Sequence, residues 1–291
     1  MNEPGDVTFG TEYTRETGER SEKSNWVKDV LETAYVVGAF EGYTVKDNRV
    51  TLLLDRCCFR GDDKVWSSGE IHELVQELEG RDRWRLKLRF ASLLGVPWKF
   101  VAYQETPRRV ALYALTADET RLENEFGRYR EFAAWTEEFR DLKMKSAYQE
   151  TGLPGFDKAL RQLGVPWPGN LDAVVGRVVD CEPLAVVEYQ NTNPKYGVER
   201  HCNNDWFLGK GNRKGDEQRW KVLDVVRLHA QRPLWIFVWS QKRSQGTKAK
   251  IVREIVYSND VEERPPGLRY SVKKTMPDGE LVEWVAAQLG T

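Results

Sequence analysis

Two acidic residues in the second half of the chain are placed to do chemistry together. Asp172 is the second residue of the segment LDAVVG. Glu188 follows the apolar run of PLAVVEYQ, and Gln190 lies two residues further on. Segments rich in Val and Leu and bounded by Pro, Gly or Asn predict short buried strands. Mg²⁺ prefers oxygen ligands and keeps room for water and a phosphate. The two segments therefore predict half of a hard-cation site, and a pair of ordinary solvent-facing strand ends is the alternative.

This pattern resembles the PD-(D/E)XK superfamily of restriction-endonuclease-like nucleases over about residues 147–240. Asp172 and Glu188 match the two acidic positions of the family motif. Gln190 stands where the family usually has Lys, and Pro168 lies four residues before Asp172 instead of directly before it. The resemblance implies a mixed central sheet flanked by helices, and Mg²⁺- or Mn²⁺-dependent hydrolysis of phosphodiester bonds in nucleic acid.

The resemblance also implies further metal ligands beside the two carboxylates. The carbonyl of Tyr189 would complete the protein's share of the metal shell. In this family a helix ahead of the metal strands often adds another acidic residue. Glu150, at the end of a predicted helix, is the nearest candidate, with Glu137 and Glu138 as competitors and an exposed helix-end Glu as the alternative.

The amide at Gln190 decides whether hydrolysis is expected. An amide can hydrogen-bond an attacking water, but it carries no charge and cannot accept the proton. Three outcomes are therefore open. Gln190 suffices to position the water, or a cation comes from elsewhere, with Lys195 as the nearest candidate in the sequence. In the third, hydrolysis is lost while nucleic-acid binding remains.

A long polar segment after the second strand favours a nucleic-acid partner. From Tyr189 to Arg253 there are fourteen basic and five acidic residues, which leaves nine positive charges, whereas the whole chain carries −1. Basic side chains hold phosphates and aromatic ones stack on bases; a solvated charged face or a loop pinned to the core are the alternatives. The expected contact residues are Asn191, Asn193, Lys195, Arg200, Trp206, Lys210, Arg213 and Lys214.

Length and composition indicate a globular protein of two domains. The chain has 291 residues, of which 40% are hydrophobic and 31% charged. We expect a flexible tail over 1–23, an N-terminal α/β domain over 24–117 and a nuclease domain over 118–291. The four Cys form no disulfide or zinc pattern, and there is no signal-like start or membrane-length apolar run. A cytoplasmic protein that does not bind membranes is expected.

Hydrophobic periodicity predicts an α/β or α+β fold with a mixed central sheet flanked by helices. The resemblance implies that the C-terminal half forms a restriction-endonuclease-like core. Helices are predicted over 26–40, 68–78, 84–94, 119–148, 216–230 and 280–289. Strands are predicted over 49–59, 98–104, 109–115, 171–176, 183–190, 233–240 and 248–258.

One internal repeat is visible. The segment 83–103 parallels 219–239, since both start Arg-Trp and place Pro at the same offset before an apolar strand. Upstream of them, TLLLDRC (51–57) parallels LAVVEYQ (184–190), which matches Asp55 to Glu188. The repeat indicates either a duplicated half whose first copy lost its site, or two ordinary helix–strand units.

Three classes of function follow. The first is a DNA endonuclease of restriction or defence type, with RNA as a less expected substrate; because cutting both strands often needs two active sites, it is expected as a homodimer. The second is a catalytically inactive nucleic-acid-binding module on the same scaffold. The third is a protein-interaction domain in which some of the eleven Trp form the contact face.

Overall fold

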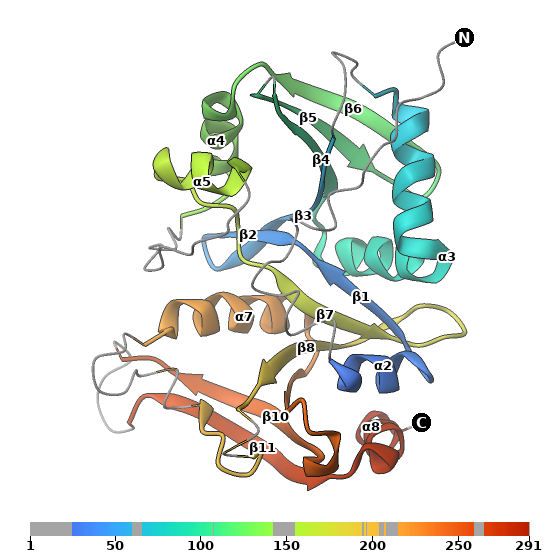
Figure 1. Ribbon diagram of the computed structural model, residues 1–291, viewed down its shortest axis with the longest axis vertical. Helices are drawn as coiled ribbons and strands as arrows, with labels where there is room; N and C mark the ends of the chain where they lie inside the picture. The colour runs from blue at the N-terminus through green and yellow to red at the C-terminus, as the bar shows by residue number, and fades with distance from the viewer. Residues whose placement is uncertain are drawn as a thin grey trace. The chain divides into compact units, whose positions relative to one another are not determined.

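The computed structural model describes residues 25–59, 66–106, 108–141, 155–193, 195, 197–203, 207, 215–258 and 265–290. Within these ranges the chain forms two compact units. Unit 1 spans Phe40–Asn170, and unit 2 joins the residues up to Ala39 with those from Leu171 onward. Each unit is a mixed sheet with helices packed on it (Figure 1). In the described part of the chain, no helix is both long and apolar enough to cross a membrane.

Unit 1 is built on a five-stranded sheet. Its strands are β2 (Gly42–Lys46), β3 (Arg49–Cys58), β4 (Trp98–Glu105), β5 (Arg108–Leu115) and β6 (Thr120–Phe126), in that order across the sheet. β3 and β4 run parallel, with the helix α3 (Ser68–Leu94) between them in the chain, while all other pairs are antiparallel. This is the crossover that parallel neighbours require.

The helices of unit 1 lie on both faces of its sheet. α3 begins at a capping box between Ser67 and Glu70, and Gly80 interrupts its helical geometry, so that it consists of the two helical pieces predicted from the sequence. α4 (Tyr129–Glu137) and α5 (Gly155–Gln162) pack on the other face, where Phe132 and Phe156 join the core (Figure 1).

Unit 2 is built on a six-stranded sheet with the order β1-β7-β8-β9-β10-β11. The strands are β1 (Val36–Phe40), β7 (Leu171–Gly176), β8 (Pro183–Asn191), β9 (Leu234–Trp239), β10 (Thr247–Val256) and β11 (Gly267–Met276). β8 and β9 are parallel and are connected through α7 (Glu217–Ala230), whereas the pairs β7–β8, β9–β10 and β10–β11 are antiparallel.

The core of unit 2 fills one face of its sheet. α2 (Trp26–Glu32) and α8 (Leu281–Leu289) cover that face, and Trp235 and Phe237 of β9 pack against Trp284 of α8. Because side chains alternate along a strand, the residues between the core positions face the opposite side, where α7 lies. This second face carries the candidate site.

The two units repeat one topology, in which β2, β3, α3, β4, β5 and β6 correspond to β7, β8, α7, β9, β10 and β11. The register also repeats. Asp55 of β3 pairs with Phe100 of β4, and Glu188 of β8 pairs with Ile236 of β9. Asp55 and Glu188 therefore occupy the same position in their sheets, which favours duplication over two unrelated helix–strand units.

The structure corrects four expectations. The predicted helix over 26–40 ends at Glu32, and its apolar end forms β1. The predicted helix over 119–148 begins instead as β6, because residues 120–126 pair with β5, and only Tyr129–Glu137 is helical in the described residues. β11 was not expected. The division expected at 117/118 falls between the paired strands β5 and β6, so these residues stay in unit 1.

Candidate functional site

Asp172 and Glu188 lie side by side on neighbouring strands. Ala173 of β7 pairs with Val187 of β8, so that Asp172, one residue earlier, lies opposite Glu188. Asp172 is held in place by the backbone, because its Oδ2 accepts a hydrogen bond from the amide of Tyr189 at 2.9 Å. The pairing of the two carboxylates, expected from the sequence, is present on the face that α7 covers.

Glu188 has an unusual environment for a carboxylate. Its residue surface is only 3% exposed, and its Oε1 accepts a hydrogen bond from Arg219 Nη2 at 2.6 Å. Among the described residues, no group donates a hydrogen bond to Glu188 Oε2, although this atom is buried. Burial raises the pKa of Glu188 to about 8; the Arg219 charge opposes this rise and the Asp172 charge adds to it.

Arg219 also belongs to the site. In the sequence it is one of fourteen basic residues between Tyr189 and Arg253, and nothing there distinguishes it from the others. It lies in the first turns of α7, and its Nη2 is also 3.8 Å from Asp172 Oδ1. The attraction of Glu188 raises the pKa of the guanidinium above its already high ordinary value. About a third of the Arg219 side chain is exposed, which allows this cation to move away from the carboxylates without being buried elsewhere.

Two of the expected ligands of a hard divalent cation, Asp172 and Glu188, lie together here. A buried carboxylate oxygen without a hydrogen-bond donor is costly unless a cation or water completes its shell, and Glu188 Oε2 is such an atom within the described residues. Tyr189 turns its ring toward the core, where it stacks near Phe237 at 6.3 Å. Described His, Cys, Asp and Glu side chains form no cluster of three that could hold a metal. The expected third acidic residue, Glu150, lies outside the described residues.

Gln190 belongs to a chain of three polar side chains. Its Oε1 accepts a hydrogen bond from Asn203 Nδ2, and Asn203 Oδ1 accepts one from Lys250 Nζ. Asn203 and Lys250 are almost fully buried, at 1% and 2% exposure. This arrangement fixes the amide group of Gln190 and connects it to a buried lysine that the sequence analysis did not single out.

Lys250 shares a cross-strand row with Glu188. Ile236 of β9 pairs with Glu188 on one side and with Lys250 of β10 on the other. Directly opposed residues point to the same face of a sheet, so Lys250 faces the side that carries the carboxylates. Burial lowers the pKa of Lys250 to about 8, and Lys248 and Lys273 add to this effect. In the sequence, the only sign of this buried lysine is that it stands between the apolar residues Ala249, Ile251 and Val252.

The predicted nucleic-acid contacts fall into two groups. Asn191, the last residue of β8, is exposed, and so are Asn193, Lys195 and Arg200 on the segment that follows. Asn193 Oδ1 accepts a hydrogen bond from the Lys195 amide at 2.9 Å. Lys195, expected as the replacement cation, is exposed. The other four expected residues lie outside the described residues: Trp206, Lys210, Arg213 and Lys214.

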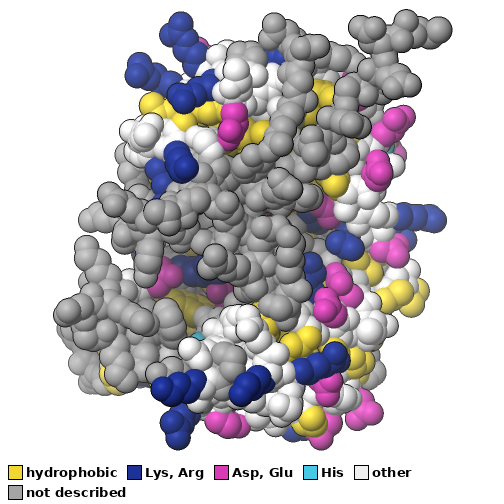
Figure 2. All heavy atoms as spheres, in the orientation of Figure 1, with side chains coloured by type: hydrophobic (Ala, Val, Ile, Leu, Met, Phe, Trp, Pro, Cys, Tyr) yellow, Lys and Arg dark blue, Asp and Glu magenta, His cyan; other side chains and the backbone are white. Residues whose placement is uncertain are grey.

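Part of the predicted basic surface is neutralised within unit 2. Besides Arg219, ion pairs engage several basic residues of the stretch 189–253: Arg227 with Asp224, Arg232 with Glu182, Arg243 with Asp278, and Lys248 with Glu199. On the face drawn in Figure 2, described Lys and Arg side chains lie in separate groups among Asp and Glu side chains. The excess of nine charges therefore overstates the field that a phosphate would meet at the described residues.

Comparison with protein-family models, with curated proteins and with solved structures found no match for this chain.

Proposed function

We propose that the chain is a Mg²⁺- or Mn²⁺-dependent nuclease whose active site lies in unit 2, on the face that α7 covers. The support for this proposal is that Asp172 and Glu188 lie opposite each other. In addition, Glu188 Oε2 is buried and receives no hydrogen bond from a described residue. DNA is the proposed substrate and an endonuclease of restriction or defence type the proposed class, with RNA as the alternative. The restriction-endonuclease-like core remains part of this proposal.

In this proposal Asp172, Glu188 and the carbonyl of Tyr189 hold the cation. A cation bound there would polarise a phosphate and lower the pKa of a bound water. Asp172 is pre-oriented for this task by its hydrogen bond from the Tyr189 amide. Arg219 must leave the carboxylates when the cation binds, and its partly exposed guanidinium is then available to a phosphate oxygen.

Lys250 takes the charge role that the family motif gives to Lys. Below about pH 8 it is protonated and places a positive charge on the face that carries Glu188. Asn203 occupies the carbonyl oxygen of Gln190, so the Gln190 amide nitrogen is left to donate to a water or a phosphate. Lys250 and Gln190 thus divide between them the charge and the hydrogen bond that one lysine would supply.

We also propose a cytoplasmic homodimer. All four cysteines lie within the described residues and none is in a disulfide, as expected in a reducing compartment. Two copies of one site would allow both strands of a duplex to be cut.

The second candidate function is nucleic-acid binding without cleavage, and the Arg219 contact favours it. A guanidinium 2.6 Å from Glu188 competes with any cation for the same carboxylate. If this ion pair is permanent, the site is a structural remnant, and the exposed polar residues after β8 would bind phosphates without hydrolysing them.

A cleavage assay separates the two functions. Supercoiled plasmid, single-stranded DNA and RNA are incubated with Mg²⁺ or Mn²⁺ and with wild type, Asp172→Ala, Glu188→Ala or Glu283→Ala. The last is a control, because Glu283 is exposed on α8. We expect cleavage by wild type and the control alone, with circular dichroism showing that all four fold.

Cleavage that persists in Glu188→Ala would overturn the site. Salt-dependent binding of nucleic acid by wild type, without cleavage under either metal, would establish the second function.

A further inference from the structure

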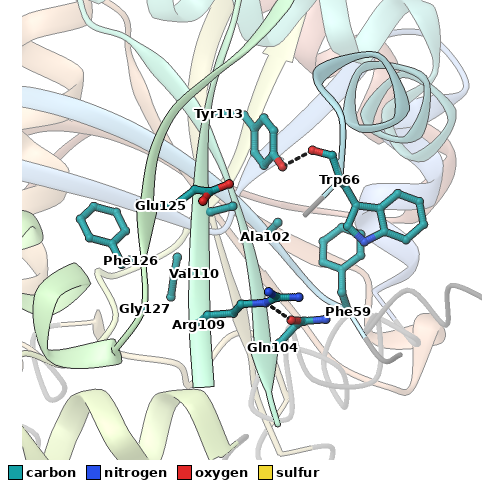
Figure 3. A pocket seen from close by; sticks show the side chains of 11 residues that line it. Phe59, Trp66, Ala102, Gln104, Arg109, Val110, Tyr113, Glu125, Phe126 and Gly127 are labelled. Carbon is teal, nitrogen blue, oxygen red and sulfur yellow. Dashed lines mark hydrogen bonds between the residues drawn. The ribbon is translucent and has the colours of Figure 1, made fainter. Parts of the chain in front are cut away.

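Unit 1 contains a pocket on the face of its sheet that α3 covers. Its volume is about 210 Å³, and its walls come from β4, β5 and β6 and from the residues on either side of the segment 60–65 (Figure 3). Phe59 and Trp66 lie on one side of the pocket and Phe126 on the other, with Glu125 and Arg109 between them. All of these residues belong to unit 1.

The hollow exists because two small residues meet in the sheet. Ala102 of β4 pairs with Ala111 of β5, while the neighbouring pairs on that face are Gln104 with Arg109 and Phe100 with Tyr113. At the matching positions of unit 2, Val238 pairs with Lys248, and both side chains are larger than alanine. The pair of small residues is therefore particular to unit 1 and is not part of the shared topology.

The walls suit a flat ring. The Phe59 and Trp66 rings are in contact, with centroids 5.2 Å apart. Tyr113 donates a hydrogen bond to the carbonyl of Trp66 at 2.6 Å and so fixes the backbone at this residue. A dry cavity of about 150 Å³ is enough to bind benzene, so this pocket has room for a larger planar molecule. Aromatic walls hold nucleobases by stacking, which any base allows.

The polar groups of the pocket determine which base would form complementary hydrogen bonds with it. Glu125 offers only acceptors, and Arg109, which donates to Gln104 Oε1, offers only donors. A carboxylate is best matched by two neighbouring donors on one ring edge. Guanine has this pair, its N1–H and N2–H₂, and beside them the O6 acceptor that Arg commonly recognises. Adenine, cytosine and uracil each lack two adjacent donors on the pairing edge.

We propose that this pocket binds an unpaired guanine base, stacked on the Trp66–Phe59 wall, with Glu125 accepting from its pairing edge and Arg109 donating to O6. The choice of a nucleobase over other flat rings rests on the proposed action on nucleic acid. Base binding in unit 1 does not require cleavage, however, and unit 1 would serve to recognise a displaced or single-stranded guanine while unit 2 cuts.

A titration of the full chain with mononucleotides tests this. GMP, AMP, CMP and UMP are each titrated by calorimetry in EDTA, so that no divalent cation links the ligand to the carboxylates of unit 2. The variants are Glu125→Gln and Ala111→Leu, and Asp118→Asn is the control, because Asp118 is an exposed residue of the β5–β6 turn that does not line the pocket.

We expect wild type to bind GMP at least about tenfold more tightly than the other three nucleotides. Glu125→Gln removes this preference, Ala111→Leu lowers the affinity for all four, and the control behaves as wild type. Glu125 is exposed, so its substitution reports on binding even if Ala111→Leu fails to fold.

Failure of folded wild type to bind GMP, or equal binding of all four nucleotides that Glu125→Gln leaves unchanged, overturns the inference. GMP binding by a chain that cleaves nothing supports the pocket and counts against the nuclease, whereas cleavage without GMP binding does the reverse.

Discussion

Asp55 and Glu188 occupy the same position in two sheets of the same topology, but their carboxylates have opposite surroundings. Asp55 Oδ2 accepts hydrogen bonds from Lys87 Nζ at 2.9 Å and Trp98 Nε1 at 2.7 Å, and Oδ1 accepts one from the Glu41 amide at 3.2 Å. Glu188 Oε2 receives none from the described residues. The chain thus fills this position with its own hydrogen-bond donors in unit 1, whereas in unit 2 the proposed function places a cation at Glu188.

The first prediction is that the two carboxylates differ in their effect on stability. Asp55→Asn is expected to lower the free energy of unfolding by about 3–5 kcal/mol. It breaks a buried ion pair and leaves the buried charge of Lys87 with less negative charge to balance it. Glu188→Gln should change it by less than about 1 kcal/mol, because its partner Arg219 is partly exposed and can be rehydrated. Urea unfolding followed by circular dichroism measures both, and equal losses would contradict the contrast.

The second prediction concerns the pH dependence of metal binding. Glu188 must lose its proton to bind a cation, and its pKa is raised to about 8. Mn²⁺ affinity is therefore expected to rise by up to about tenfold per pH unit below pH 8 and to level off above it. The raised pKa also affects stability. Between the ordinary pKa of Glu and about pH 8, Glu188 keeps its proton in the folded state and loses it in the unfolded state. The contribution of Glu188 to the free energy of unfolding therefore falls as pH rises through that range.

Calorimetric titration of Mn²⁺ at several pH values measures this dependence. Glu188→Gln is the control and should bind Mn²⁺ weakly at every pH. An affinity for wild type that does not vary between pH 6 and 8 would show that Glu188 is not a ligand.

The third prediction is that Arg219 and the cation compete. Arg219→Gln removes the guanidinium from Glu188, but it also removes the charge that holds the Glu188 pKa down. Glu188 of the variant therefore has a pKa above that of wild type, which is about 8. At a pH high enough for the carboxylate to be ionised in both proteins, the variant should bind Mg²⁺ more tightly than wild type. At lower pH, protonation of Glu188 should cancel the gain. Lys221→Gln, on the same helix, is the control. Tighter binding at no pH would mean that Arg219 does not occupy the cation position.

The elements around the site were predictable because their signals are local. β7, β8 and β9 are short apolar runs ended by turn residues, and α7 has an apolar stripe followed by the left-handed residue Gln231 at its end. Asp172 and Glu188 could be paired because the two strands are close in the sequence. The antiparallel register that opposes them then follows from a single short connection.

The remaining features depend on contacts between residues far apart in the sequence. Phe126 and Tyr129 fit a helical stripe, but the hydrogen bonds of β6 to β5 make residues 120–126 a strand. Arg219 reaches Glu188 across 31 positions, and Lys250 joins Asn203 across 47. Hydrophobic periodicity reports which side of an element is buried and does not report which distant polar group faces it there, so these partners could not be predicted from the sequence.

The fourth prediction is that Lys250 carries the charge needed for cleavage. Lys250→Met is expected to reduce the cleavage rate by about 10²–10³-fold, as the loss of one charge-stabilising group does, while Mn²⁺ affinity stays the same because Lys250 has no described contact with either carboxylate. Lys250→Arg should restore part of the rate. Lys274→Met is the control, because Lys274 is exposed and pairs with Ala249 on the neighbouring strand instead of with Lys250.

The pH profile separates this role from a structural one. Cleavage by wild type needs Glu188 without its proton and Lys250 with its proton, and both pKa values lie at about 8, so the rate should peak near pH 8 and fall on either side. In Lys250→Arg the fall on the alkaline side should disappear, because arginine keeps its charge. Stability gives a second measurement. Between about pH 8 and 10 the unfolded wild type keeps a proton on Lys250 that the folded protein has lost, so its free energy of unfolding should rise with pH relative to that of Lys250→Met. An alkaline limb that persists unchanged in Lys250→Arg would assign it to another group and remove Lys250 from the site.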